Sequence, residues 1–323
     1  MYTVNDKSIS EIQIPIVDIT ALRLGSGSKK VGDLLHKASQ EFGFIYIIGH
    51  GIPFELIEKT RQVFLEFFQR PDHEKSIITV SKNHRGWLGP NSAVMDEDAL
   101  PDLKESFVWG CEFESEEIPN DHPLRGINYW PPFLPEMRTY AMDYFAKAQE
   151  VAHHLMRGFA LGLNLEEYFF LRSTSKPLSR ASSVYYPAQI KELGEERFGV
   201  GPHTDFGVLT VLCQDEVGGL QVQNLKGDWI AAPPIEGSLV VNVGDLLSRW
   251  TDGAYRSTPH RVINTSNRER LSLVLAFDPD PETLIDSREI FGPNHTSREP
   301  AISCGEYLSW RFEKAFAYRR NNL

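Results

Sequence analysis

The chain has 323 residues, of which 41% are hydrophobic, 24% charged and 11% aromatic, and its formal net charge is -11 at pH 7. Disorder along the whole chain is excluded, because this apolar and aromatic content is enough to build a packed core. A general nucleic-acid or anionic-membrane binder needs a basic face, and no run of basic residues supplies one.

The three cysteines and the N-terminus bear on the compartment. Cys111, Cys213 and Cys304 are too few and too widely spaced for a disulfide framework or a Cys-x-x-Cys zinc site. No stretch approaches the roughly 18 apolar residues of a membrane span, and residues 1–10 lack the apolar centre of a signal peptide. We therefore expect a cytoplasmic protein that uses neither nucleic acid nor a membrane as its partner. The sequence leaves its oligomeric state open.

The first half of the chain predicts a mixture of helices and strands. Residues 14–19 and 44–48 are typical of short strands, the second of them buried. Apolar residues at helical spacing predict helices over 31–41 and 54–68 and one or two more within 138–171. At the other end of the chain, a helix is expected over 307–318.

After Pro177 the chain becomes β-rich. Short apolar runs are separated by Gly, Pro, Asn and Asp. These runs lie at 183–186, 207–213, 219–223, 229–232, 239–243, 261–264 and 270–277. Their spacing of roughly ten residues indicates an antiparallel sandwich or barrel. We expect one domain over 1–323, mainly β with flanking helices: a mixed region at 10–135, a β core at 178–280 and a C-terminal helix within 300–323.

The sequence His203-Thr204-Asp205 is the first pattern that suggests chemistry. On an extended strand, residues i and i+2 point to the same face, so this imidazole and carboxylate would converge. His260, beside another β-rich run, would be the third ligand. Two histidines and one carboxylate on one face of an octahedron leave three open positions, which suits non-haem Fe(II) and O₂. A surface His-x-Asp with an unrelated histidine is the competing interpretation.

A second pattern is Arg270-Leu271-Ser272, which opens the last β-rich run. Arg270 and Ser272 share a parity and so face the same side of a strand. A guanidinium and a hydroxyl on one face are suited to holding a carboxylate. The alternative is an ordinary surface arginine in a polar turn beside Arg268 and Glu269.

Taken together, the blocks of the sequence resemble the 2-oxoglutarate- and Fe(II)-dependent oxygenases of the isopenicillin N synthase-like group. The resemblance covers nearly the whole chain. In the C-terminal half it is carried by 203–205, 218–222, 241–245, 257–262 and 270–272. In the N-terminal half it is carried by 14–18, 42–45 and 50–53, with weaker matches at 67–71, Lys75 and 104–105.

The resemblance implies a double-stranded β-helix, or jelly roll, as the core at 178–280, with 10–135 as the family's N-terminal region. His203, Asp205 and His260 would bind the catalytic iron. Arg270 would pair with the distal carboxylate of 2-oxoglutarate, to which Ser272 and Tyr186 would donate hydrogen bonds.

One position departs from the family's pattern. Relatives often carry Asn where this chain has Val184, which changes the polarity beside the iron. Asn242 and Asp245 are expected to shape a turn. The implied cofactors are Fe(II), 2-oxoglutarate as cosubstrate and O₂, with ascorbate as a reductant.

The implied reaction is hydroxylation, desaturation or cyclisation of a small molecule, with release of succinate and CO₂. One alternative is an Fe(II) oxidase of the same fold that does not use 2-oxoglutarate, like isopenicillin N synthase or the ethylene-forming aminocyclopropane oxidase. Such relatives also retain Arg-x-Ser. A binding protein without activity is a third hypothesis, against which the intact set of ligands argues.

On the substrate side, the run 105–113 alternates in character and has one largely apolar, aromatic face. We expect Phe107 and Trp109 to line the pocket, with core packing as the competing explanation. Arg85 is expected to meet an anionic group of the substrate, and Val184 to lie beside the substrate.

Overall fold

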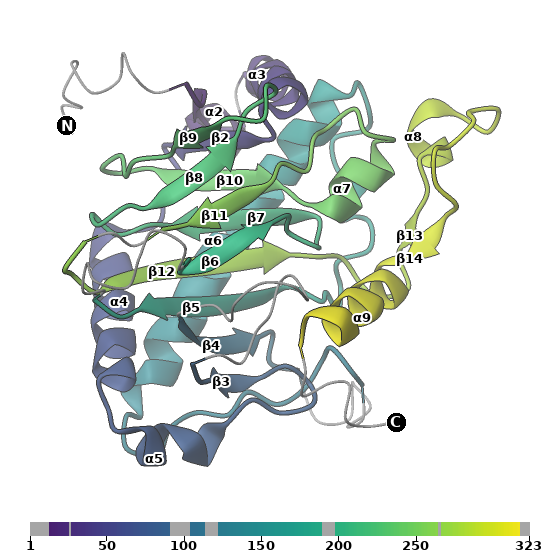
Figure 1. Ribbon diagram of the computed structural model, residues 1–323. Helices are drawn as coiled ribbons and strands as arrows, with labels where there is room; N and C mark the ends of the chain where they lie inside the picture. Colours follow the sequence, from purple (N-terminus) through teal and green to yellow (C-terminus); the bar gives the residue numbers. More distant parts are fainter. Residues whose placement is uncertain are drawn as a thin grey trace.

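The computed structural model describes residues 13–25, 27–90, 104–113, 122–188, 198–263 and 266–316. Its centre is a large sheet of eight strands with a smaller sheet of four strands in front of it (Figure 1). In spatial order, the large sheet consists of β1 (Ile16–Asp18), β2 (Phe44–Ile48), β10 (Leu239–Val243), β7 (Leu209–Cys213), β12 (Arg270–Phe277), β5 (Arg180–Tyr186), β4 (Glu105–Gly110) and β3 (Gly86–Leu88). The small sheet consists of β6 (Val200–His203), β11 (His260–Val262), β8 (Leu220–Gln223) and β9 (Trp229–Ala231).

Strand pairing is antiparallel in both sheets except between β1 and β2, which are parallel. A separate two-stranded ribbon is formed by β13 (Leu284–Ile285) and β14 (Ile302–Ser303). The large sheet takes strands from both halves of the chain, because β1 to β4 extend a sheet whose centre is made by β5, β7, β10 and β12. The expected mainly β core with flanking helices is confirmed.

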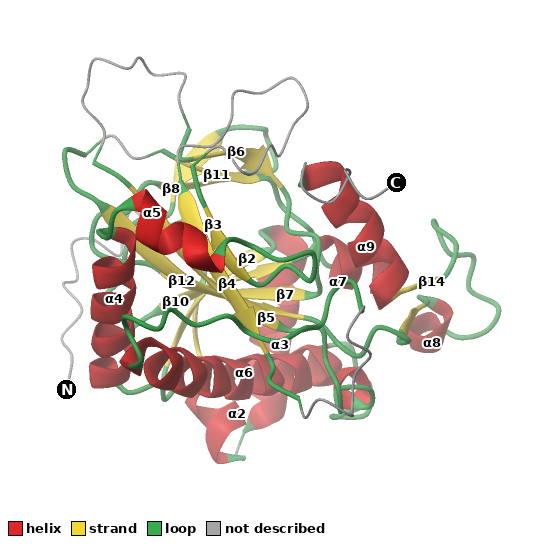
Figure 2. Cartoon of the chain, turned by 90° about the horizontal axis from the view of Figure 1, so that it is seen from below, coloured by secondary structure: helices red, strands yellow, loops and turns green. Residues whose placement is uncertain are grey.

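Helices cover the outer face of the large sheet, as Figure 2 shows. The helices are α2 (Thr20–Leu24), α3 (Ser28–Glu41), α4 (Phe54–Phe68), α5 (Asp72–Lys75), α6 (Glu136–Gly162), α7 (Asp245–Trp250), α8 (Arg288–Phe291) and α9 (Cys304–Ala315), with 3-10 turns at Ser76–Ile78 and Phe169–Leu171. The long helix α6 packs closely on α3 at three glycines. A methyl group at Gly32 would lie 2.7 Å from the carbonyl oxygen of Gly158, so only glycine permits this approach.

The main core fills the space between these helices and the large sheet. An aromatic cluster at its centre joins α4 to β4: the rings of Phe64 and Trp109 stack at 4.9 Å, and Phe67 meets Phe107 edge to face at 5.3 Å. A smaller core, which includes Tyr46, Val222 and Val262, lies between the two sheets. Burial of these side chains fixes which face of each strand points to the helices and which points between the sheets.

Most elements expected from periodicity are present, with shifted ends. The helices expected over 31–41 and 54–68 are α3 and α4, and the region 138–171 contains α6 and a 3-10 turn. The C-terminal helix lies earlier in the chain than expected, because α9 begins at Cys304 and ends at Ala315; residues 317–323 lie outside the described part. Strand β6 was missed, since Val200–His203 contains Gly201 and Pro202 and has no apolar alternation.

Candidate active site

His203, Asp205 and His260 come together at one end of the small sheet. His203 is the last residue of β6 and His260 the first of β11, and the two are direct partners in this antiparallel pair. Their ring centroids lie 4.2 Å apart. Oδ1 of Asp205 lies 3.9 Å from Nε2 of each histidine. One donor atom from each residue falls within 4.8 Å of the other two, the arrangement that a single metal ion requires.

The turn after β6, rather than the strand itself, brings Asp205 to the histidines. His203 and Asp205 were expected to share one extended strand, but β6 ends at His203. Asp205 is held from behind: its Oδ2 accepts hydrogen bonds from Oγ1 of Thr210 at 2.6 Å and from Nδ2 of Asn242 at 2.8 Å. Oδ1 is therefore the oxygen that faces the histidines.

These contacts correct the expected role of Asn242. It lies within β10, one residue before the end of the strand, where it pairs with Thr210 of β7, and it does not shape a turn. An outer hydrogen-bond partner of this kind orients a ligating carboxylate. Only the pairing of β7 with β10 brings Thr210 and Asn242 together, so the sequence carried no local signal for this role.

The site sets the protonation state that a metal ligand needs. Burial and the adjacent His260 hold the pKa of His203 well below its usual range, which favours the neutral imidazole. Nδ1 of His203 lies 2.8 Å from the carbonyl oxygen of Gly201, to which the neutral tautomer donates, and this leaves the Nε2 lone pair directed to the site. Burial alone would raise the pKa of Asp205, but His260, His203 and the two hydrogen bonds hold it below its usual range. A neutral imidazole and a carboxylate are donors that Fe(II) accepts.

A second buried polar group lies between the sheets. Arg270 begins β12 and is 1% exposed, and its Nε donates to the carbonyl oxygen of Gly218 at 2.6 Å. Neither Nη1 nor Nη2 of Arg270 has a hydrogen-bond partner among the described residues, and the same holds for Oγ of Ser272. Burying a guanidinium without partners is costly, so this fork is suited to receive a carboxylate of a bound ligand. Tyr186 lies directly opposite Arg270 across the ladder, with its ring 4.6 Å from the guanidinium carbon.

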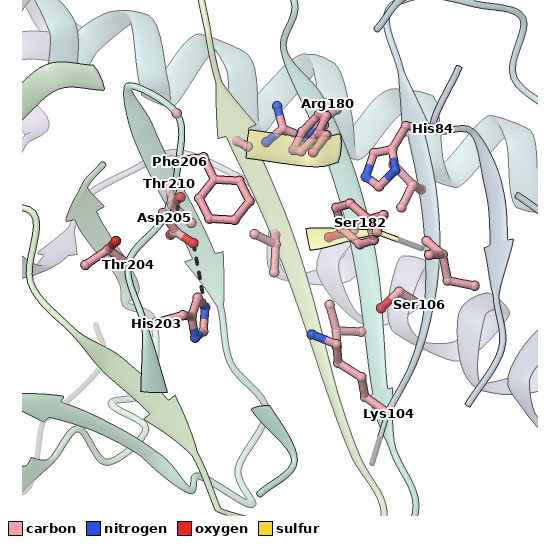
Figure 3. A pocket seen from close by; sticks show the side chains of 18 of the residues that line it. His84, Lys104, Ser106, Arg180, Ser182, His203, Thr204, Asp205, Phe206 and Thr210 are labelled. Carbon is pink, nitrogen blue, oxygen red and sulfur yellow. Dashed lines mark hydrogen bonds and ion pairs between the residues drawn. The ribbon is translucent and has the colours of Figure 1, made fainter. Parts of the chain in front are cut away.

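A cavity of about 170 Å³ adjoins the metal centre (Figure 3). His203 and Asp205 lie on one side of it, and His84, Ser106 and Lys104 lie on the opposite side. Its other described lining residues are Leu88, Gly89, Val108, Arg180, Ser182, Val184, Thr204, Phe206, Gly207, Thr210, Val274, Ala276, Phe312 and Phe316. Phe312 and Phe316 place the end of α9 at this cavity.

The strand register decides which residues of β4 face the cavity. Ser106 lies opposite Val184, which lies opposite Ser272, and these three form one row across β4, β5 and β12. Directly opposed residues share a face of the sheet. Val184 therefore lies between the buried Ser272 and Ser106 and lines the cavity.

The expectation that Phe107 and Trp109 line the pocket is wrong. Phe107 lies in the next row, opposite Ser183, and so points to the helices. Both side chains are fully buried in the aromatic cluster with Phe64. The sequence showed alternation in β4 but could not tell its faces apart, because both faces of this strand are covered.

Arg85, which was expected to meet an anionic group of the substrate, does not line the cavity. It is 2% exposed, and its guanidinium donates to the carbonyl oxygens of His84 at 3.0 Å and Leu124 at 3.3 Å. It is not among the described residues that line the cavity, whereas its neighbour His84 is. Arg85 thus fastens the loop that presents His84, a residue that sequence reasoning did not select.

Comparison with known proteins agrees with this geometry. Residues 179–279 match the family model of the 2OG-Fe(II) oxygenase superfamily, and residues 14–133 match that of the non-haem dioxygenase N-terminal region, described from morphine synthesis. The chain belongs to the 2OG-Fe(II) oxygenase superfamily. It is therefore an Fe(II)- and 2-oxoglutarate-dependent oxygenase.

Several relatives are similar over most of the chain. A protein of Dictyostelium discoideum named as a probable iron/ascorbate oxidoreductase is 37% identical, over 98% of each chain. The 2-oxoglutarate-Fe(II) type oxidoreductase hxnY of Emericella nidulans is 36% identical, over 80% of this chain and 76% of its own. The crystal structure of a full-length Neurospora crassa protein in complex with alpha-KG and thymine superposes with a TM-score of 0.83 at 26% identity, over 93% of this chain and 96% of that one. The expected jelly-roll fold is thus confirmed.

Proposed function

We propose that His203, Asp205 and His260 hold the catalytic Fe(II) and that Arg270, Ser272 and Tyr186 hold 2-oxoglutarate. The observation that carries this proposal is the fit of two buried groups to the family's two ligands. Three donor atoms lie within 4.8 Å of one another, and a buried guanidinium and hydroxyl nearby have no partner among the described residues. A bound dicarboxylate would supply the acceptors that Arg270 and Ser272 lack.

The residues and the bound groups then divide the work. When bound, Fe(II) and 2-oxoglutarate supply the activation of O₂. Thr210 and Asn242 orient Asp205, and the carbonyl of Gly201 fixes the tautomer of His203. The Arg270 fork sets the position of the keto acid through its distal carboxylate. The walls of the cavity hold the substrate and exclude water.

We further propose that the substrate is a small, largely apolar molecule. The cavity volume of about 170 Å³ is similar to that of cavities that accept a single aromatic ring. The wall formed by β4, β5 and β12 includes Val108, Val184 and Val274 together with Ser106 and Ser182, and Phe206 and the two phenylalanines at the end of α9 also line the cavity. A substrate therefore contacts aliphatic and aromatic side chains next to the metal centre.

The charges of the lining favour a neutral or anionic polar group on that substrate. Among the described lining residues, Asp205 is the one acidic side chain, and it is assigned to the metal. Arg180 forms an ion pair with the buried Asp278 at 2.8 Å. Lys104 lines the cavity across from His203 and contributes positive charge there, which favours a carboxylate or another acceptor over an ammonium group.

We also propose that the protein is cytoplasmic and forms one domain. The three cysteines are free, and burial raises the pKa of Cys111 to about 11, which fits a protein of a reducing cytoplasm. No helix of the described residues is long and apolar enough to cross a membrane. The sheet shared by residues from both halves supports one domain over 1–323, with the regions 10–135 and 178–280 joined by common strands.

Anaerobic optical titration of the metal-free protein with Fe(II), and then with 2-oxoglutarate, tests the assignment. We expect a weak visible charge-transfer band that requires both additions and is lost in His203→Ala. The substrate class is then tested by offering small acids and their neutral amides as candidate substrates, with ascorbate present, and measuring the succinate that each releases. Iron binding without the band would refute the assignment of Arg270, Ser272 and Tyr186 to 2-oxoglutarate. A full band in His203→Ala would refute the ligand assignment.

A further inference from the structure

Asp245 is a meeting point of three segments of the chain. It is the first residue of α7; three side chains donate hydrogen bonds to its carboxylate, and a fourth forms an ion pair with it. Oδ1 accepts from Oγ of Ser257 at 2.6 Å, and Oδ2 accepts from Oγ1 of Thr204 at 3.2 Å. From α9, the hydroxyl of Tyr307 donates to Oδ2 at 3.3 Å, and Nη1 of Arg311 lies 3.0 Å from the same oxygen. The structure therefore does not show the simple turn residue expected from the sequence.

Two of these segments carry the metal ligands. Thr204 lies between His203 and Asp205, and Ser257 lies three residues before His260. The backbone N–H of Asp245 also donates to the carbonyl oxygen of Asp205 at 2.7 Å. A shift of the Asp245 side chain or backbone is therefore transmitted to the turn that presents Asp205.

The third segment is the helix at the mouth of the cavity. The guanidinium of Arg311 in α9 pairs with Asp245 and lies 4.0 Å from the ring centre of Phe206. Phe206 follows Asp205 directly and lines the cavity. The next residue of α9, Phe312, lines the same cavity and stacks on His84 at 4.9 Å. With α9 packed in this position, Phe312 forms part of the cavity wall, and Arg311 packs on Phe206, the residue next to the proposed ligand Asp205.

We propose that Asp245 is a positioning residue that couples the seating of α9 to the metal centre. The proposal rests on the assignment of Asp205 and the two histidines as metal ligands. With α9 seated, Tyr307 and Arg311 hold the Asp245 carboxylate, which holds Thr204 and Ser257 on either side of the centre. Because such coupling is reciprocal, metal binding stabilises the seated helix by the same factor by which the seated helix strengthens metal binding.

The experiment compares amide hydrogen exchange in α9 with and without Fe(II) and 2-oxoglutarate under anaerobic conditions. In the parent protein, Fe(II) and 2-oxoglutarate should slow amide hydrogen exchange of residues 304–315 by about fivefold or more. A fivefold effect is about the smallest that coupling between two binding sites usually has. Asp245→Asn replaces an acceptor with an amide that cannot accept from all four donors. It should abolish this slowing and weaken Fe(II) binding about tenfold, as loss of an outer partner of a ligand does.

A second variant changes the residue of α9 that pairs with Asp245. Arg311→Met removes the ion pair while keeping an unbranched side chain against Phe206, and Arg311 touches none of the proposed ligands. It should reduce both the slowing of exchange and the affinity for Fe(II) in the same direction as Asp245→Asn. Together, the two substitutions should weaken Fe(II) binding by less than the product of their separate effects, because both break one link. Should Asp245→Asn fail to fold, Arg311→Met still decides the question.

Two controls match these changes in chemistry. Asp252→Asn alters a carboxylate just beyond the other end of α7, which accepts from the N–H of Arg298 at 2.9 Å and lies 2.9 Å from Nε2 of His295. Arg288→Met breaks a surface pair with Asp286. Both controls should keep the ligand-dependent slowing of the parent protein. Equal slowing in the controls and the two test variants, or none in a parent protein that binds Fe(II), overturns the coupling while leaving the metal site intact. A parent protein that binds no Fe(II) refutes the ligand assignment and the coupling together.

Discussion

Arg270 lies directly opposite Tyr186 in the antiparallel pair of β12 and β5, with its guanidinium carbon 4.6 Å from the centre of the phenol ring. Both side chains are buried between the sheets. The ring and the carbonyl of Gly218, which accepts from Nε, hold the fork in one orientation. The two terminal nitrogens are thereby directed to the proposed cosubstrate in advance of binding.

Arg270→Lys should raise the KM for 2-oxoglutarate by about tenfold or more with a smaller effect on Fe(II) affinity. A lysine keeps the charge but loses one of two charge-assisted hydrogen bonds, which contribute roughly 1.5–3 kcal/mol each. Succinate release over a range of 2-oxoglutarate concentrations measures the change. Arg261→Lys, on β11, is the matched control and should leave the KM unchanged. An unaltered KM in Arg270→Lys would remove Arg270 from the cosubstrate site.

Thr210→Val should weaken Fe(II) binding by about 10–100-fold, the usual effect of losing an outer partner of a metal ligand. The substitution keeps the shape of the side chain and removes the hydroxyl that donates to Oδ2 of Asp205 at 2.6 Å. Anaerobic titration measures the affinity. Thr60→Val makes the same change in α4, where the hydroxyl bonds to the carbonyl of Leu56, and should leave Fe(II) binding as it is. If both variants bound Fe(II) alike, Thr210 would have no part in orienting Asp205.

Phe107→Ala should lower the free energy of unfolding by about 3–5 kcal/mol, the cost of emptying an aromatic site in a packed core. The ring contacts Phe64, Phe67 and Trp130 and is fully buried. Denaturant unfolding measures this loss. The KM for the substrate found by the succinate screen should not change.

Ser106→Leu, at the adjacent position of β4, should have the opposite pattern. Its side chain enters the cavity beside Val184, so we expect a raised KM for that substrate with little loss of Fe(II) or 2-oxoglutarate binding. A change of substrate preference in Phe107→Ala, with none in Ser106→Leu, would reverse the assigned faces of β4.

The stability of the protein should fall as the pH drops from about 7 to 5.5, and His50 should account for part of the slope. Burial lowers the pKa of His50, and Nδ1 of its ring accepts the N–H of Ile52 at 3.1 Å in the fold. The unfolded chain therefore takes up a proton near pH 6.5 while the folded chain does not, so the stabilisation present above pH 6.5 is lost below it.

His50→Asn can still accept from Ile52 but does not titrate. Denaturant unfolding at several pH values should show a shallower slope for this variant than for the parent protein. Carboxylates with lowered pKa values, such as those of Asp252 and Asp286, lose their contribution at lower pH and do not obscure this window. Parallel slopes in the two proteins would exclude His50 as a source of the pH dependence.

The sequence by itself indicated the reaction class, which the comparisons confirm, and the residues that we propose hold the metal and the cosubstrate. His203, Asp205 and His260 are ligand types in a recognisable spacing, and Arg270 and Ser272 share a strand face by parity alone. His203-Thr204-Asp205 and Arg270-Leu271-Ser272 are local patterns, so they can be found without knowing which strands pair, whereas His260 reaches His203 only because β11 pairs with β6. The β-rich texture after Pro177 likewise predicted an antiparallel core, because alternation and turn residues are local properties.

Tertiary structure decided what surrounds those residues. Phe107 and Ser106 alternate on one strand, but only the covering of β4 by helices on one face and the cavity on the other assigns the aromatic residue to the core. Asn242 supports Asp205 because β10 pairs with β7, and Asp245 meets Arg311 because α9 packs across the end of the sheets. These contacts join residues far apart in the chain, and the packing that creates them depends on the whole fold rather than on any local pattern.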